Sequence, residues 1–369
     1  MKQKKLVFIF LIVSLLCIAP LPLLNLFLMY QQGKLDRESI TTQRLFTTDH
    51  IETSINYFAY RTLHRSLNSR QTVAGKEGFL FLGNQYAAIL DKASGVYPYQ
   101  KSEIDQWTDK LKAVEDWYKK RNIEFILVIA PNKSSVYPEM LPDSIVYKEG
   151  GTITDDIVKY AKKKDIAVLD LRKILRENKG ANLLYYKTDT HWNNKGSSIG
   201  FRETMHFLNH QYKKRYKIPA YTLYKVREGA GDLAGFLKIR KSLPSDYEVN
   251  FAYDFNKTVR VCHGKISAEG HTIQPCKTVN NPVVNIYAVD QYTISKDAEN
   301  PQKLLLLSDS FSTANSKPYN AAFSTLWKLH QGRIHGKELA DFVEEHRPDI
   351  VIYQIVERDL YSPTLVEPL

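Results

Sequence analysis

The segment Ile123-Glu-Phe-Ile-Leu-Val-Ile-Ala130 decides the fold class of this chain, and it ends at Pro131. Such a nearly continuous apolar run is typical of strands that are buried on both faces of a parallel sheet. The segment before it has apolar residues at three- and four-residue spacing, which predicts an amphipathic helix: Ile104, Trp107, Leu111, Val114 and Trp117. A helix followed at once by a buried strand indicates an α/β architecture.

The same alternation continues along the chain. We expect strands at 166–171, 303–308 and 349–356, and helices at 155–164, 194–212, about 319–330 and 341–345. Strands that alternate with helices predict a parallel sheet with helices on both faces. Residues 218–300 have scattered Gly and Pro and short β-like runs without helical periodicity, so we interpret them as a β-rich insertion.

These patterns divide the chain into five parts. We expect a membrane anchor at 1–30 and a polar stalk at 31–74. The α/β domain then has a first part at 75–217 and a second part at 301–369, separated by the insertion at 218–300. The second part carries the candidate nucleophile described below.

The composition is that of an ordinary globular protein. Of the 369 residues, 43% are hydrophobic and 25% are charged, which argues against a disordered chain. The mean hydropathy of −0.36 argues against a polytopic membrane protein. The formal net charge is +11, and without the three lysines of residues 1–5 it is +8, spread along the chain. We therefore expect no nucleic-acid partner.

The N-terminus predicts export. Three lysines in Met1-Lys-Gln-Lys-Lys5 precede an apolar run at 6–30, which is long enough for a membrane-spanning helix of roughly 20 residues despite Pro20 and Pro22. The lysines should stay in the cytoplasm and the rest should lie outside, so we expect a single-pass inner-membrane protein with a periplasmic domain. A cleaved signal peptide remains an alternative. Cys17 suggests a lipoprotein, but Leu16 before it is too large for the usual processing motif.

Cys262 and Cys276 enclose a short loop. Outside the cytoplasm, a disulfide between them is favoured, and on the loop-entropy model it stabilises by roughly 3 kcal/mol. His263 and His271 lie in the same loop, so a Cys2His2 metal site is an alternative, although the spacing matches no common zinc pattern. Two unpaired thiols are a further alternative.

Two polar segments follow elements of the predicted sheet. One contains Asp189 and His191, and the other places Ser310 just after an apolar strand. Ligands bind outside the carboxyl ends of strands in open α/β sheets. A serine nucleophile needs a base, and the histidine base needs a carboxylate to hold its tautomer. The three residues therefore predict a Ser-His-Asp arrangement, while a helix-capping role for Ser310 and Asp309 remains an alternative.

Four motifs together resemble a known family. They are Gly78-Phe-Leu-Phe-Leu82, Pro131-Asn-Lys133 with Val136-Tyr-Pro-Glu-Met-Leu-Pro142, Asp189-Thr-His191-Trp192-Asn193, and Ser308-Asp-Ser310-Phe. In this order they are similar to the SGNH-hydrolase-like domain of the alginate O-acetyltransferases AlgJ and AlgX. The resemblance covers about residues 75–358 except much of the insertion. It includes the permuted order in which Asp-x-His precedes the serine. Ser308 is a departure, since many relatives have glycine there.

The resemblance implies an SGNH-hydrolase-like (flavodoxin-like) fold and a catalytic triad of Ser310, His191 and Asp189. Lys133, Trp192 and Arg358 fall in family-like motifs and are candidates for substrate binding. Alternatively, Trp192 packs against its loop and Arg358 pairs with a neighbouring carboxylate.

The implied function is O-acetylation of a polysaccharide during its export, through an acetyl-serine intermediate. No metal or organic cofactor is required. A membrane-bound O-acyltransferase is the implied partner, because acetyl groups must be passed outward. Two alternatives stay open: a polysaccharide acetylesterase, which uses the same triad with water as acceptor, and a catalytically silent polysaccharide-binding or assembly subunit.

Overall fold

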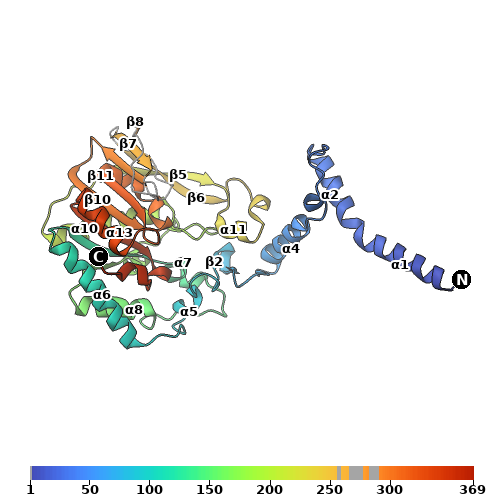
Figure 1. The fold of residues 1–369 in the computed structure, drawn as a ribbon, viewed down its shortest axis with the longest axis horizontal. Coiled ribbons are helices and arrows are strands. Elements are labelled where there is room, and N and C mark those ends of the chain that lie inside the picture. Colours follow the sequence, from blue (N-terminus) through green and yellow to red (C-terminus); the bar gives the residue numbers. More distant parts are fainter. Residues whose placement is uncertain (1, 256–258, 266–276, 282–290) are drawn as a thin grey trace.

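The computed structural model describes residues 2–255, 259–265, 277–281 and 291–369, and its main element is an eight-stranded sheet (Figure 1). From one edge to the other the strands are β4 (Val168–Asp170), β3 (Glu124–Ala130), β12 (Ile350–Val356), β10 (Asn300–Ser308), β11 (Phe323–His330), β9 (Gln291–Ser295), β7 (Val259–Lys265) and β8 (Lys277–Asn281). The strands predicted at 123–130, 166–171, 303–308 and 349–356 are therefore confirmed as β3, β4, β10 and β12.

The sheet is mixed rather than parallel throughout. The five strands from β4 to β11 are parallel to their neighbours, as predicted. β9 is antiparallel to β11, and β7 is antiparallel to both β9 and β8. All three added strands come from residues 218–300. The β-rich insertion thus extends the sheet at β11, where it supplies hydrogen-bond partners to a strand that would otherwise be an open edge.

In the part of the chain that the structure describes, two further antiparallel pairs lie outside the main sheet. β5 (Tyr221–Glu228) and β6 (Glu248–Phe255) form a pair within the insertion. β1 (Thr72–Ala74) and β2 (Leu80–Leu82) form a small pair just before the main domain. Between β5 and β6 lies the short helix α11 (Asp232–Phe236), and this segment becomes part of the candidate site.

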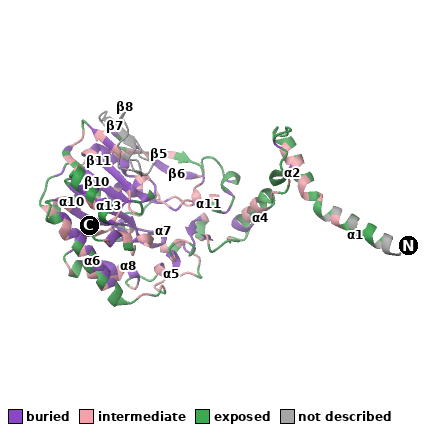
Figure 2. Ribbon diagram, viewed as in Figure 1, coloured by how far each residue is buried: buried purple, intermediate pink, exposed green. Residues whose placement is uncertain are grey.

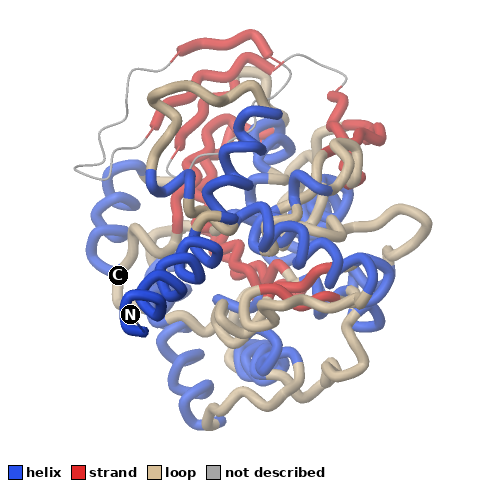
Figure 3. The backbone as a smooth tube through the Cα atoms, turned by 90° about the vertical axis from the view of Figure 1, so that its right-hand side faces the viewer, coloured by secondary structure: helices blue, strands red, loops and turns tan. Residues whose placement is uncertain are grey.

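The alternating side chains of β3 explain why the sheet has a core on each face. Ile126, Val128 and Ala130 belong to one cluster, which includes Phe201 and Met205 of α10 (Asn194–Tyr212). Phe125, Leu127 and Ile129 belong to a second cluster with side chains of α6 (Lys101–Lys119), α8 (Ile153–Lys163) and α13 (Gly336–His346). Figure 2 shows the strands as mostly buried, and Figure 3 shows helices on both sides of the sheet.

The helix predicted at 319–330 is wrong in its second half. α12 (Ser316–Ala322) ends at Ala322, and Phe323 has an extended backbone with φ −122° and ψ 142°. β11 begins there and pairs in parallel with β10, with Leu304 opposite Leu326. Burial on both faces of the sheet makes a strand as apolar as a buried helix, so hydrophobicity alone does not separate the two. The other predicted helices are α6, α8, α10 and α13.

The N-terminal apolar run forms two helices instead of one. α1 (Lys2–Ile18) and α2 (Pro20–Gln31) meet at Ala19, with Pro20 at the first position of α2. Proline lacks the N–H that would continue the first helix, which accounts for the break. Within the described residues, none of the helices combines the length and the apolar character that a membrane crossing needs. The single spanning helix expected at 6–30 is therefore not observed.

The polar segment at 31–74 contains α3 (Thr42–Leu45) and α4 (Asp49–Thr62). α4 contacts the insertion, since Lys238 Nζ lies 2.7 Å from Asp49 Oδ1 and 2.6 Å from Glu52 Oε2. The N-terminal helices extend away from the main body in Figure 1. The domain boundaries given above stay predictions.

The remaining helical segments are short. They are α5 (Ile89–Ala93), α7 (Lys133–Val136), α9 (Arg172–Glu177), and the 3-10 turns η1 (Lys76–Gly78), η2 (Pro138–Met140), η3 (Arg240–Ser242), η4 (Ser310–Thr313), η5 (Glu357–Asp359) and η6 (Pro363–Val366). The predicted Cys262–Cys276 disulfide, like the alternative metal site in that loop, falls outside the residues whose side chains the structure describes.

Candidate active site

Ser310 lies at the carboxyl end of β10, at the first position of η4. Asp309 fixes this turn, because its Oδ1 accepts a hydrogen bond from Phe311 N at 2.9 Å and its Oδ2 accepts one from Val356 N at 2.7 Å. The Asp309 carboxylate therefore caps the turn and ties the end of β10 to the end of β12. Ser310 is not the capping residue. Its hydroxyl faces the loop that carries His191.

That loop connects α9 to α10 and carries Asp189 and His191. Its end is fixed by Asn193, whose Oδ1 accepts hydrogen bonds from Lys195 N and Gly196 N, both at 3.0 Å, and so caps α10. Its middle is fixed by the buried carboxylate of Glu248 on β6. This carboxylate accepts hydrogen bonds from Lys187 N at 2.9 Å and Thr188 N at 2.6 Å.

The two segments bring the three predicted residues into one chain of contacts. His191 Nε2 lies 2.7 Å from Ser310 Oγ, and His191 Nδ1 lies 2.7 Å from Asp189 Oδ1. Asp189 Oδ1 also accepts from His191 N at 2.9 Å. If the ring carries its proton on Nδ1, facing the carboxylate, Nε2 is free to accept the serine proton. Such an arrangement can convert a serine hydroxyl into a nucleophile.

The electrostatics of Asp189 suit this role. Burial opposes ionisation of the carboxyl, but hydrogen bonds and the charge of His191 outweigh it and lower the pKa of Asp189 to about 2. The carboxylate is therefore ionised at neutral pH. It can hold the imidazole in one orientation and stabilise the imidazolium that forms when the serine loses its proton.

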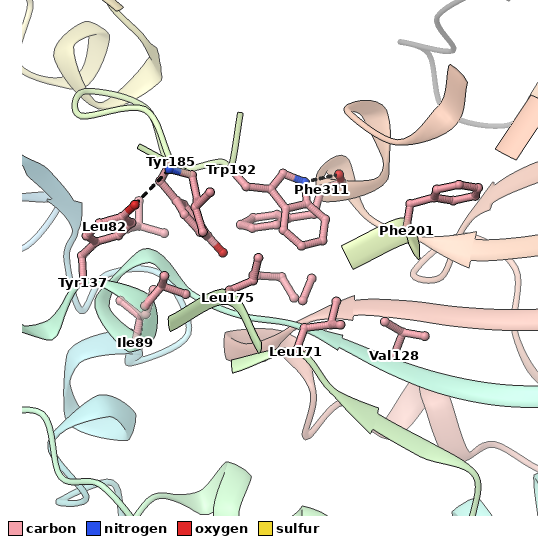
Figure 4. Close-up of a cluster of buried hydrophobic side chains, with 14 of the residues drawn as sticks. Leu82, Ile89, Val128, Tyr137, Leu171, Leu175, Tyr185, Trp192, Phe201 and Phe311 are labelled. Atoms are coloured by element: carbon pink, nitrogen blue, oxygen red, sulfur yellow. Dashed lines mark hydrogen bonds between the residues drawn. The ribbon is translucent and has the colours of Figure 1, made fainter. Parts of the chain in front are cut away.

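Trp192 links the loop that carries His191 to the turn that carries Ser310. Its side chain is only 1% exposed, and its Nε1 donates a hydrogen bond to Phe311 O at 2.8 Å (Figure 4). The indole and the Phe311 ring lie 5.5 Å apart, centroid to centroid. Trp192 also lines the cavity described below. Trp192 thus packs against its loop and borders the cavity, and a role in substrate binding stays a prediction.

Lys133 has a different place from the one expected for a substrate-binding residue. It is buried, and its Nζ donates to the backbone oxygens of Tyr186, Lys187 and Asp189 at 3.0, 3.0 and 2.6 Å. Burial lowers the pKa of Lys133 to about 8. All three N–H donors of the ammonium are used, so Lys133 holds the loop that carries Asp189 in position. Lys133 does not line the cavity at Ser310.

Arg358 is also absent from the lining of that cavity. It lies in η5, with its Nε 3.6 Å from Asp359 Oδ2. Its guanidinium carbon lies 5.6 Å from the centre of the Phe311 ring. Arg358 therefore pairs with the carboxylate of Asp359, and its guanidinium lies over the ring of Phe311, the residue after Ser310.

The Ser310 hydroxyl faces a cavity of about 490 Å³. The β5–β6 pair, the loop before α10 and the segment from Ser310 into α12 form its walls. The lining residues used below are Tyr186, Asp189, Glu228, Glu248, Asn250 and Lys317. A cavity of this size accommodates a small ligand or one or two sugar rings of a polymer.

Asp232, at the start of α11, was not among the residues selected from the sequence. Its backbone N–H donates to Asp189 Oδ2 at 2.9 Å, and its own Oδ1 accepts from Thr190 N at 2.7 Å. Burial and the neighbouring Asp189 raise the pKa of Asp232. Gly231 before it packs so closely that an added Cβ would lie 2.2 Å from Asp189 Cβ. The two glycines of Gly229-Ala-Gly-Asp232 were the available signal for such a close approach.

In the described part of the chain, Asp189, His191 and Asp232 form a group whose potential ligand atoms lie within 4.8 Å of one another. Such a group is able to hold a metal ion. Both ring nitrogens of His191 already face hydrogen-bond partners, Asp189 and Ser310, so metal binding would compete with the contacts described above.

Comparisons with known proteins give a consistent result. The family model described as "SGNH hydrolase-like domain, acetyltransferase AlgX" matches residues 72–259, just over half of the chain. The probable alginate O-acetylase AlgJ of Pseudomonas aeruginosa is 24% identical over 173 residues, which cover 45% of this chain and 41% of that protein. The match thus spans less than half the length of this curated relative.

Solved structures share the fold. PatB1 of Bacillus cereus superimposes with a TM-score of 0.56 at 17% identity, over 78% of this chain and 97% of that one. A DHHW family protein from Eubacterium siraeum gives a TM-score of 0.53 at 13% identity, over 81% of this chain and 94% of that one. At these identities the similarity shows the α/β fold, which agrees with the predicted fold class.

Proposed function

This chain belongs to the family of the SGNH hydrolase-like domain of the acetyltransferase AlgX, and on that premise we propose that it is an O-acetyltransferase acting on polysaccharide hydroxyls. The observation that carries the proposal is the contact chain from Ser310 Oγ through His191 to Asp189, with both links 2.7 Å long, at the wall of a cavity. Transfer proceeds through an acetyl group bound to Ser310.

In the first half-reaction Ser310 Oγ attacks the carbonyl carbon of the acetyl donor while its proton passes to His191 Nε2. The tetrahedral intermediate then collapses. The bond between the acetyl carbon and the donor's leaving group breaks, and the leaving group takes the proton from Nε2. The product is an acetyl ester of Ser310 with His191 neutral again.

In the second half-reaction a sugar hydroxyl attacks the acetyl carbon, and His191 Nε2 takes the hydroxyl proton. The bond to Ser310 Oγ breaks, Oγ recovers the proton, and the acetylated sugar leaves. Asp189 stays ionised throughout, because its pKa of about 2 lies far below neutral pH. Water in place of the sugar gives an acetylesterase, so the acceptor distinguishes these two functions.

The proposal is tested by trapping the acetyl-enzyme. After brief incubation with 4-nitrophenyl acetate, mass spectrometry should find an acetyl group on the peptide that contains Ser310. Ser310→Ala should abolish both the label and donor turnover while the melting temperature stays near that of the parent. A purely structural role for the hydroxyl predicts instead a lower melting temperature with turnover kept. Parent-level turnover in the variant leaves the silent binding subunit as the remaining interpretation.

The cellular setting is part of the proposal. The three lysines before the apolar N-terminal run support an extracytoplasmic domain held at the inner membrane, beside a membrane-bound O-acyltransferase that supplies acetyl groups. Alkaline phosphatase fused after residue 70 should then be active. An inactive phosphatase together with an active cytoplasmic reporter at the same position would overturn this location.

A further inference from the structure

The cavity beside Ser310 carries more negative than positive side chains. Among the residues that the structure describes, its lining has three carboxylates, those of Asp189, Glu228 and Glu248, and one ammonium, that of Lys317 on α12. The contacts from Ser310 through His191 to Asp189, together with the cavity, identify a candidate site without any reference to these charges. What the charges add is a constraint on the ligand, because a cleft lined mainly by one sign of charge focuses the field of its walls.

Two of the carboxylates face each other across the β5–β6 pair, since Glu228 is directly opposite Glu248 in the antiparallel register. Like charges at directly opposite positions destabilise a strand pair. Within the described residues, neither carboxylate forms a salt bridge with Lys, Arg or His. The charge of Lys133 acts on Glu248, whereas Glu228 accepts its hydrogen bonds from the uncharged groups of Tyr186 and Asn250, which indicates that the charge of Glu228 serves the site rather than the packing of the hairpin.

Glu248 has its acceptor capacity occupied by the loop that carries Asp189. It accepts from Lys187 N, Thr188 N and Thr188 Oγ1, and it is 3% exposed. The nearest buried cation, Lys133, uses its donors on backbone oxygens behind that loop. Glu248 is therefore a positioning residue that also contributes negative charge to the cavity wall.

Glu228 is the exposed carboxylate and the one a ligand can reach. Tyr186 Oη donates to its Oε2 at 3.2 Å, and Asn250 Nδ2 donates to its Oε1 at 2.8 Å. A carboxylate has about four acceptor positions, so two donors hold the group in one orientation and leave further lone pairs for a ligand. Hydroxyl groups of a sugar are suitable donors, whereas another carboxylate has nothing to donate.

We propose that the acceptor is an uncharged glycan, recognised through its hydroxyls by Glu228 on the β5–β6 pair, and that polyuronates are disfavoured. A uronosyl carboxylate in this cavity would meet the exposed carboxylate of Glu228, while among the described lining residues Lys317 is the ammonium that offsets it and the charge of Lys133 acts on Asp189 and Glu248 from behind the wall. Like charges brought together in a binding site repel each other and so act against the charged acceptor. This inference rests on the proposed acetyltransferase function and names the substrate class of the same site.

The test measures acetyl transfer from 4-nitrophenyl acetate to two acceptors of equal length, cello-oligosaccharides and oligogalacturonates, by mass spectrometry. We expect the parent to acetylate the uncharged acceptor at least about tenfold faster, which corresponds to about 1.4 kcal/mol of discrimination. Added salt should shrink the ratio, because it screens the partly exposed charges.

Charge-changing variants locate the effect. Glu228→Lys should lower the ratio of uncharged to uronate transfer by at least about tenfold, and Glu228→Gln should lower it by less. The matched control is Asp254→Lys, which makes the same charge change at an exposed position of β6 that does not line the cavity. It should keep the parent ratio. If Asp254→Lys lowered the ratio of uncharged to uronate transfer as much as Glu228→Lys does, the net charge of the protein and not the Glu228 contact would set the preference.

The outcomes separate this inference from the proposed function. A parent enzyme that acetylates the two acceptors equally, or prefers the oligogalacturonate, overturns the inference and leaves the transferase function standing. Donor hydrolysis that depends on Ser310, with no transfer to either acceptor, overturns both. A ratio that Glu228→Lys leaves unchanged overturns the role of Glu228.

Discussion

Replacing Asp189 by asparagine tests the electrostatic part of the site. Asp189→Asn keeps the shape of the side chain but removes its charge. The carboxylate accepts hydrogen bonds from His191 N, from Asp232 N and, with the ring proton on Nδ1, from the imidazole of His191. Burial alone would raise its pKa, but these bonds and the charge of His191 lower the pKa of Asp189 from 3.8 to about 2.

The magnitude follows from the linkage between protonation and folding. The pKa difference corresponds to about 2 kcal/mol at 1.36 kcal/mol per unit. Because the folded-state pKa of Asp189 is depressed, this stability is fully present above about pH 4 and is lost as the pH falls toward 2. Between pH 6 and pH 3 the expected loss from this residue alone is about 1 kcal/mol.

The assay is urea unfolding of the parent and of Asp189→Asn at pH 6 and pH 3. The loss of unfolding free energy between the two pH values should be about 1 kcal/mol smaller in the variant, since asparagine does not titrate. Asp254→Asn, at an exposed position of β6, is the control and should keep the loss of the parent. Donor turnover at neutral pH should fall by up to about 10⁴-fold, because the histidine loses its charged partner. An unchanged pH dependence of stability would refute the electrostatic reasoning.

Three further predictions concern the surroundings of the site. Gly231→Ala should strongly reduce donor turnover in a protein that stays folded by circular dichroism, because the new Cβ would lie 2.2 Å from Asp189 Cβ; parent-level turnover would contradict the close approach. Lys133→Met should lower the free energy of unfolding by about 3 kcal/mol, measured in urea, since three backbone oxygens lose their buried donor; a change below about 1 kcal/mol would argue against this role. Cys262 and Cys276 should appear as linked peptides in non-reducing mapping of exported protein, whereas stoichiometric zinc on free thiols would support the metal alternative.

The sequence predicted those elements whose local pattern is unambiguous. β3 and α10 were placed correctly because one is a continuous apolar run and the other begins at an asparagine cap. β11 was mistaken for the end of a helix, since its burial on the sheet hides the alternation of a strand. The β-rich nature of 218–300 was visible, but its addition to the edge of β11 depends on pairing between distant segments that no local pattern specifies.

The candidate site shows the same limit. Ser310, His191 and Asp189 were selected as residue types in suitable positions, and the structure brings them within hydrogen-bond distance. Lys133 was expected to contact substrate, yet it binds backbone oxygens, because a lysine's burial depends on tertiary packing. Asp232 was missed, since its carboxylate approaches Thr190 from a segment more than 40 residues away.

The position of β12 has a consequence for how the protein folds. It is the last strand of the chain, at Ile350–Val356, yet it lies between β3 and β10 and separates them in the sheet. Until the residues of β12 have emerged, β10, the strand that leads to Ser310, has no connection to the half of the sheet formed by β3 and β4. Pairing of residue 124 with residue 350 also gives the sheet a high contact order, which slows folding. The candidate active site is therefore expected to assemble only after β12 has been synthesised, as a late and cooperative step, and a chain truncated before Ile350 should remain inactive whatever its earlier segments have formed.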